Sequence, residues 1–268
     1  VEGQGRIVAY GSTVDNKTGD AVFVPAIRPQ PKDELMLPVV ARTPGQSGTN
    51  WRTELRIANL EEHTVDLIME FRPRRNDPGQ PVFIERSVLP WSVLKADDVL
   101  AVFGLNNGVG SVRVTVLQGP STVAATARIF NSTHGGTYGQ FVAAADSNSG
   151  RSAAISHADS NLTTRTNLGV CEVGGGSITI RATLLDTFGR PIADPILLTA
   201  EPYQLVQVDD VFAAADQTAT SNAWIQLELV AGDGDFFAYG SMVDSVTGDA
   251  IFVPSQPLPE APPPYPEP

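Results

Sequence analysis

Aspartates supply most of the side chains that could do chemistry in this sequence. Adjacent pairs, Asp97-Asp98 and Asp209-Asp210, occur at matching places in the two halves of the chain, within the stretches DDVLA and DDVFA. Two converging carboxylates can act as the acid and base of glycoside hydrolysis. An aspartate before a short apolar stretch is also a common N-cap of a helical turn. Because similar apolar residues follow both pairs, we expect helix caps rather than a catalytic pair.

Other catalytic motifs are not found in the sequence. It has no GxSxG, HExxH or P-loop motif. Its three histidines, His63, His134 and His157, stand in loop-like contexts. Catalysis needs a nucleophile with its base, converging carboxylates or a metal. We therefore expect a protein that is not an enzyme, with no catalytic residue and no cofactor.

Four aspartates near the C-terminal end are candidates for a calcium site. Asp233 and Asp235 precede an expected strand, and Asp244 and Asp249 belong to the turn that follows it. Calcium prefers carboxylate oxygens gathered on glycine-rich turns. An earlier copy of the same stretch has glutamine and arginine at the first two positions, and no complete ligand loop is visible. We expect these aspartates to stabilise turns, and calcium binding is the alternative.

The basic residues Arg72, Arg74 and Arg75 form a possible contact patch in a chain of net charge −12. Residues 1–154 hold 15 acidic and 15 basic side chains, whereas residues 155–268 hold 15 acidic and only 3 basic ones. This balance argues against nucleic acid and anionic membranes as partners. The patch is then a solvated loop, or it meets the acidic half of a neighbouring molecule. Such a head-to-tail contact can build an open filament.

Membrane insertion and an internal disulfide are both unexpected. The sequence has no apolar run of about 18 residues, the length that a spanning helix needs. Cys171 is the single cysteine, so we expect it to be a small buried side chain. The tryptophans Trp51, Trp91 and Trp224 fall in or beside strand patterns, and we expect them in the core.

Short alternating segments make up the rest of the chain. There are 24 glycines and 21 prolines, and runs rich in Val and Thr lie between turn residues. This is the profile of an all-β protein. Seven short strands in the first half predict an antiparallel β-sandwich, with one helical turn at residues 96–103. The expected strands are residues 51–59, 64–72, 82–89, 92–99, 110–117, 122–130 and 139–143.

Residues 1–26 recur without a gap as residues 230–255, with 16 of 26 positions identical. In each copy an apolar strand leads through a Thr-Gly-Asp turn into a second strand that ends at proline, so each copy predicts a β-hairpin. The second copy closes a complete unit. The first copy is therefore the end of a partial repeat.

These patterns divide the chain into six segments. The two sandwich units are named unit 1 and unit 2, and a proline-rich tail of polyproline-II type is expected after them. The segments are the partial-repeat hairpin (1–27), a linker that becomes a first strand (28–41), unit 1 (42–145), a flexible link (146–154), unit 2 (155–255) and the tail (256–268).

A resemblance to a known kind of module rests on four stretches: LPVVARTPGQSGTNWRTELRIAN (37–59), LPWSVLKADDVLAVFG (89–104), GTYGQFV (136–142) and the repeated AYGSxVDxxTGDAxFVP. They resemble tandem immunoglobulin-like β-sandwich modules of secreted and cell-surface bacterial proteins. The resemblance implies two tandem Ig-like antiparallel β-sandwiches, an extracellular or cell-surface location, and arrays of such units on large proteins. It implies no catalytic or ligand-binding residue.

The partial-repeat hairpin is the main functional clue, because a two-stranded hairpin alone is marginally stable in water. Its apolar side chains need a partner: an upstream remainder of the repeat, unit 1, or a neighbouring subunit reached by strand pairing. We therefore expect a non-catalytic extracellular structural or assembly protein, a repeat array or filament subunit that self-associates or continues into upstream domains. The alternative is a carbohydrate- or surface-binding accessory module of a secreted hydrolase. The apolar residues are Ile7, Val8, Tyr10, Val14, Val22, Phe23 and Val24.

Overall fold

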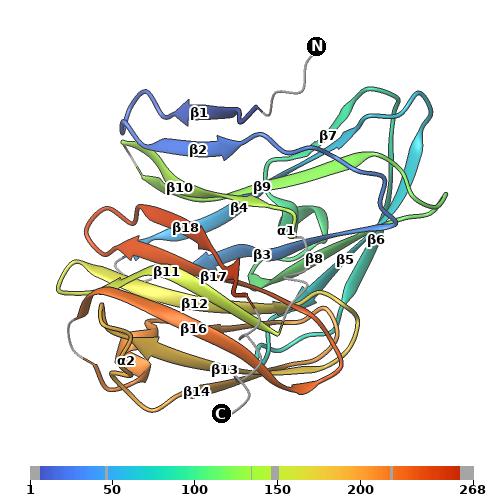
Figure 1. Ribbon diagram of the computed structural model, residues 1–268. Helices are drawn as coiled ribbons and strands as arrows, with labels where there is room; N and C mark the ends of the chain where they lie inside the picture. Colours follow the sequence, from blue (N-terminus) through green and yellow to red (C-terminus); the bar gives the residue numbers. More distant parts are fainter. Residues whose placement is uncertain (1–6, 46–47, 134, 146–150, 218–219, 260–268) are drawn as a thin grey trace.

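The computed structural model describes residues 7–45, 48–133, 135–145, 151–217 and 220–259, and it is built almost entirely from antiparallel strands (Figure 1). The all-β prediction is confirmed. The N-terminal hairpin is formed by β1 (Tyr10–Val14) and β2 (Ala21–Pro25), which pair only with each other among the described residues.

Unit 1 contains eight strands and one helical turn, and its strands form one folded-over sheet in the order β10-β9-β4-β3-β8-β5-β6, with β7 paired to β4. The elements are β3 (Glu34–Pro44), β4 (Asn50–Asn59), β5 (Val65–Pro73), β6 (Val82–Val88), β7 (Val93–Ala96), α1 (Val99–Val102), β8 (Gly108–Val116), β9 (Val123–Thr133) and β10 (Gly136–Ala143).

Unit 2 has two facing sheets, β15-β12-β17-β18 and β14-β13-β16-β11-β19. Its elements are β11 (Ser152–Ser160), β12 (Thr164–Glu172), β13 (Ile178–Leu185), β14 (Ile196–Ala200), β15 (Leu205–Val208), α2 (Val211–Ala214), β16 (Thr220–Gly232), β17 (Phe236–Asp244), β18 (Ala250–Pro254) and β19 (Gln256–Pro257).

The helix caps expected from the paired aspartates are confirmed. The Asp98 carboxylate accepts a hydrogen bond from the Ala101 amide at 3.3 Å, at the start of α1. Asp210 accepts the corresponding bond from Ala213 at 3.2 Å, at the start of α2. Each cap satisfies a backbone donor that a helical turn leaves free.

Strands begin inside both segments that were predicted to connect the units. In the segment 28–41, predicted as a linker that becomes a first strand, β3 begins at Glu34. Pro38, which has no N–H to donate, lies where the pairing of β3 with β8 shifts register. β11 begins at Ser152, inside the expected link 146–154, of which residues 146–150 lie outside the described part. Gln256 and Pro257 pair with β11 rather than starting a free tail, and residues 260–268 also lie outside it.

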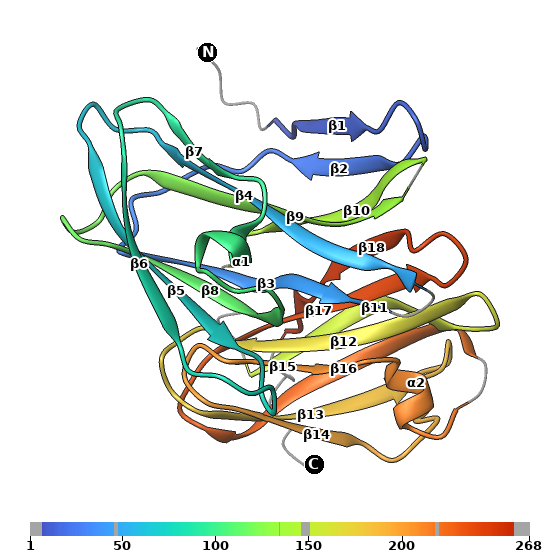
Figure 2. The ribbon, with the colours of Figure 1, turned by 180° about the vertical axis from the view of Figure 1, so that it is seen from behind.

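The apolar cluster centred on unit 1 extends across the boundary into unit 2, whose own core forms a second cluster. β3 lies between β9 on one side and β12 on the other, and residues 35–41 are buried on both of its faces (Figure 2). In unit 2, alternate residues of β12 and β17 face opposite ways. Leu168, Val170 and Ala238 join the core of unit 2, whereas Cys171 and Tyr239 join the cluster centred on unit 1. The inner sheet of unit 2 therefore has apolar side chains on both faces.

Candidate functional site

The N-terminal hairpin rests on the edge of unit 1 through its turn. The Asp15 carboxylate accepts hydrogen bonds from the backbone amide and the hydroxyl of Thr137, at 2.9 and 2.8 Å. Asp20 accepts one from the Gly139 amide at 3.0 Å and forms an ion pair with Arg128 at 3.2 Å. Of the three partners considered for this hairpin, unit 1 of the same chain is the one that the structure shows.

Only one face of the hairpin is covered by that contact. Val22 is buried and Val24 is partly buried against unit 1. Tyr10 and Phe23 stack on the other face with ring centroids 5.2 Å apart, and they remain 68% and 59% exposed. The residues of the hairpin segment that stay exposed are Ile7, Val8, Tyr10, Val14 and Phe23.

Replacing Asp15 with alanine is expected to loosen the hairpin from unit 1. Bonds from the Lys17 amide, and next from Thr137, hold the pKa of the Asp15 carboxyl well below its usual range. The carboxylate is thus the bonded form at neutral pH. Because the pKa is depressed on folding, the contact is complete above about pH 3.9, the unfolded value, and weakens as the pH falls further. Amide hydrogen exchange at residues 21–25 should accelerate several-fold in Asp15→Ala.

Asp244→Ala is the matched control for that experiment, because Asp244 holds the same position in the repeat. It accepts the equivalent turn bonds from Val246 and Thr247, both at 2.8 Å, but bonds to no other strand among the described residues. Exchange across β2 should be unchanged in this variant. Equal exchange at β2 in the Asp15 variant and the parent chain would contradict the contact.

The boundary between the units is the second region of functional interest, and it holds the repeat equivalents of Tyr10 and Phe23, with Tyr239 buried and Phe252 partly buried. Tyr239 and Phe252 stack with centroids 4.9 Å apart, and Tyr239 is only 1% exposed. Tyr239 lies directly over Gly169, where any Cβ would collide with its ring, and its hydroxyl donates to the Gln207 side chain at 2.7 Å. The hairpin of unit 2 thus packs with its aromatic face against unit 1.

Polar contacts cross the same boundary. The Ser111 hydroxyl donates to the carbonyl of Tyr203 at 2.6 Å, and the Arg113 guanidinium lies 4.0 Å from the centre of the Tyr203 ring. The Ser241 hydroxyl donates to the Gln140 side chain at 3.0 Å. Such contacts fix the position of one unit on the other.

The basic patch also belongs to this boundary. Arg74 pairs with Asp77 at 2.9 Å and with Asp209 of unit 2 at 3.5 Å, and the Arg75 amide donates to the carbonyl of Leu205. Arg72 pairs with the buried Glu70 at 2.5 Å. The sequence suggested a solvated loop or a contact with a neighbouring molecule, whereas in this structure the acidic partners of Arg74 lie in the same chain.

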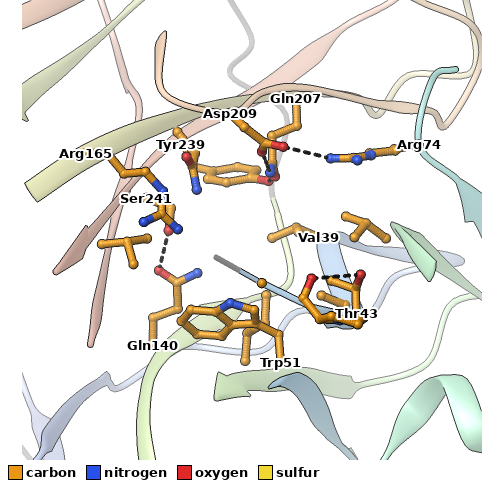
Figure 3. A pocket seen from close by; sticks show the side chains of 17 residues that line it. Val39, Thr43, Trp51, Arg74, Gln140, Arg165, Gln207, Asp209, Tyr239 and Ser241 are labelled. Carbon is orange, nitrogen blue, oxygen red and sulfur yellow. Dashed lines mark hydrogen bonds and ion pairs between the residues drawn. The ribbon is translucent and has the colours of Figure 1, made fainter. Parts of the chain in front are cut away.

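A cavity of about 320 Å³ remains at the boundary, lined by side chains of both units (Figure 3). Trp51 and Tyr239 form parts of its wall, but both rings are packed rather than open as platforms. Its polar side chains are amides, hydroxyls, the guanidiniums of Arg74 and Arg165, and the carboxylate of Asp209, which pairs with Arg74. Among the described lining residues there is no nucleophile with a base and no facing pair of carboxylates. The cavity is a gap in the packing of the two units.

Glu172 holds three loops together, and its role was not expected from the sequence. Its carboxylate is fully buried at the end of β12. The Tyr203 amide donates to it at 2.8 Å, which ties the loop that contacts unit 1 to β12. The Gly-Gly-Gly stretch and the lead into β17 supply the other donors, the amides of Gly174, Gly175, Gly176 and Asp235.

The four calcium candidates are not gathered by the fold. Asp233 and Asp235 lie before β17, whereas Asp244 and Asp249 lie at its other end. A nine-residue strand spans roughly 30 Å, so the four aspartates do not share one site, and the geometry does not favour the calcium alternative. Each carboxylate accepts a nearby backbone amide, as Asp235 does from Phe236. Within the described residues, no three His, Cys, Asp or Glu side chains are placed to hold a metal ion.

Cys171 is expected to be unreactive toward thiol reagents in the native protein. The side chain is fully buried in the shared core, and burial raises the pKa of its thiol. At neutral pH reagents do not reach the thiol, and little of it is in the reactive thiolate form. Labelling with a chromogenic disulfide should reach one thiol per chain only after unfolding in urea. Fast labelling of the native protein would contradict a closed boundary.

Comparisons with known proteins give little further information. No family model and no curated protein matches the chain. One solved structure, of a "putative secreted protein" from Parabacteroides distasonis, is 9% identical, with 93% of this chain and 85% of that chain aligned. Its TM-score is 0.24, a value too low to carry an argument. No helix among the described residues is long and apolar enough to cross a membrane.

Proposed function

We propose that this chain is a non-catalytic structural module of an extracellular protein, in which β-sandwich units stack into a stiff array. The observation that carries the proposal is the shared core. Tyr239, Cys171 and Leu205 of unit 2 pack in the same apolar cluster as the core of unit 1. Units within one chain usually move relative to each other unless their interface is large and hydrophobic. A continuous core suits a spacer or scaffold that must keep its shape.

Cooperativity of unfolding tests this proposal. Hydrogen exchange read by mass spectrometry along a urea series should show β4 of unit 1 and β13 of unit 2 losing protection at the same urea concentration. Coincident transitions indicate one cooperative unit. If unit 2 melts first and leaves unit 1 protected, the units are independent and the stiff array is wrong.

A second candidate function, binding of carbohydrate as an accessory module, is favoured by Trp91. The sequence placed this side chain in the core, but it is 67% exposed on the turn between β6 and β7, where its φ is 51°. Leu89 and Val93 beside it are also exposed. Open aromatic faces bind sugars by stacking. Co-sedimentation with cellulose, chitin and peptidoglycan tests the idea. Binding that is lost in Trp91→Ala but kept in Phe83→Ala would favour this function over the scaffold.

A further inference from the structure

We infer that the outward face of the N-terminal hairpin is a docking surface for further units of this same kind, joined on the N-terminal side of the hairpin. A strand like β12 would pair along β1, and a sheet like that of β3 would cover Tyr10 and Phe23. The inference rests on the proposed array and names the surface through which the array continues.

The first support is that one aromatic pair occurs in two settings. Tyr10 and Phe23 correspond in the repeat to Tyr239 and Phe252, and both pairs stack, with interplanar angles of 30° and 22°. Tyr239 is buried against unit 1, whereas Tyr10 is 68% exposed. The same side chains in the same local geometry therefore form a unit boundary at one position and face solvent at the other.

The free edge of β1 is the second support. Tyr239–Val243, the equivalents of β1, pair with residues 165–169 of β12. The strand β1 pairs only with β2 among the described residues, so its other edge presents backbone donors and acceptors without a neighbouring strand. Exposed edges of this kind pair readily with a further strand.

The third support is that successive hairpins stack on one another: the N-terminal hairpin contacts β10 of unit 1 through Val22 and Val24, and β10 in turn contacts β18 of unit 2. Strands β2, β10 and β18 line one apolar groove of about 600 Å³, with β10 in contact with both others. Gly136 in the turn before β10 lies against Asp15 of the hairpin. Gly248, in the turn before β18, lies against Asn131 of unit 1. At both contacts, a glycine of the later hairpin lies against the hairpin that precedes it in the chain.

The other end of the molecule argues against a second copy of this chain, docked head to tail, as the occupant, although Leu197 is exposed there. The outward face of the β13 and β16 sheet carries Thr179, Thr183 and Gln226, together with an Arg181–Glu228 ion pair at 3.1 Å. This face lacks an apolar surface like the one on unit 1 that covers Tyr239.

A tandem chain tests the inference. Residues 28–229 are placed directly before Val1, so that the hairpin at 1–26 takes the place that residues 230–255 hold in the original chain. Tyr10→Ser should lower the melting temperature of the tandem chain about as much as Tyr239→Ser lowers that of the original. In the original chain Tyr10→Ser should shift the melting temperature by no more than about 2 °C. Equal small effects in both chains would overturn the inference.

Two further measurements keep the test decisive. If the tandem chain does not fold, residues 151–229 alone, which include all of β11, are placed before Val1. The amides of Tyr10–Val14 should then become protected from hydrogen exchange, and unprotected amides overturn the inference. Sedimentation of the original chain should show a monomer, and a dimer that Tyr10→Ser abolishes would assign the surface to a second copy instead. The stiff array of units 1 and 2 can hold in either case, because its test uses only their own boundary.

Discussion

Tyr239→Ser is expected to destabilise the protein by about 3–5 kcal/mol, the usual cost of truncating a large buried aromatic side chain. The side chain is 1% exposed, stacks on Phe252 and covers Gly169 at the boundary of the two units. Its loss opens a cavity in the shared core. At about 2–4 °C per kcal/mol for a chain of this size, the melting temperature should fall by roughly 10 °C.

Two variants identify the origin of that loss. Tyr239→Phe removes only the hydrogen bond to Gln207 and should cost about 1 kcal/mol. Tyr10→Ser replaces the repeat equivalent, which is exposed, and should change stability by less than about 0.5 kcal/mol. Calorimetry of the three variants measures these changes in stability. Similar losses for Tyr10→Ser and Tyr239→Ser would contradict the burial of the unit boundary.

Glu172→Ala should cost about 3 kcal/mol or more, because it leaves several buried backbone donors without an acceptor. The carboxylate accepts five backbone amides, among them that of Tyr203, and fixes the loop that contacts unit 1. Urea unfolding measures the loss. The Ser111–Tyr203 contact should loosen as well, so Cys171 should become labelled faster in the native state.

Glu228→Ala is the control for Glu172. Glu228 pairs with Arg181 across the surface of β13 and β16, and its side chain is 36% exposed. Exposed ion pairs contribute about 0–1 kcal/mol, so this variant should be close to the parent chain in stability. The stability of Glu172→Gln should fall between those of Glu172→Ala and Glu228→Ala, because the glutamine amide keeps one acceptor oxygen but turns a donor toward the backbone amides. A loss under about 1 kcal/mol for Glu172→Ala would show that water replaces the carboxylate.

The features that could be predicted from the sequence are those with a local cause. Alternating apolar residues and glycine turns indicated antiparallel strands, and Asp98 and Asp210 indicated helix caps; the structure confirms these features. Where a strand is buried on both faces, the alternation disappears. The start of the strand within the segment 28–41, predicted only as a linker that becomes a first strand, could therefore not be located, although residues 35–41 form the buried middle of the stack.

The features that could not be predicted depend on distant parts of the chain. Tyr10 and Tyr239 stand in nearly the same local sequence, yet one is exposed and the other buried, because only the second has unit 1 beside it. Glu172 looks like a surface residue until loops from three places converge on it. Trp91 looked apolar and internal, but a turn with positive φ places it outside.

The spacing of 229 residues between the two Tyr–Phe pairs also bears on how such a protein changes in length. A genetic crossover between the DNA segments that encode residues 1–26 and 230–255 adds or removes one whole period and leaves each hairpin in register with its neighbours. A crossover elsewhere joins strands that have no partner, and its product exposes apolar surface. A length change made by a crossover inside the hairpin would therefore come in steps of two units.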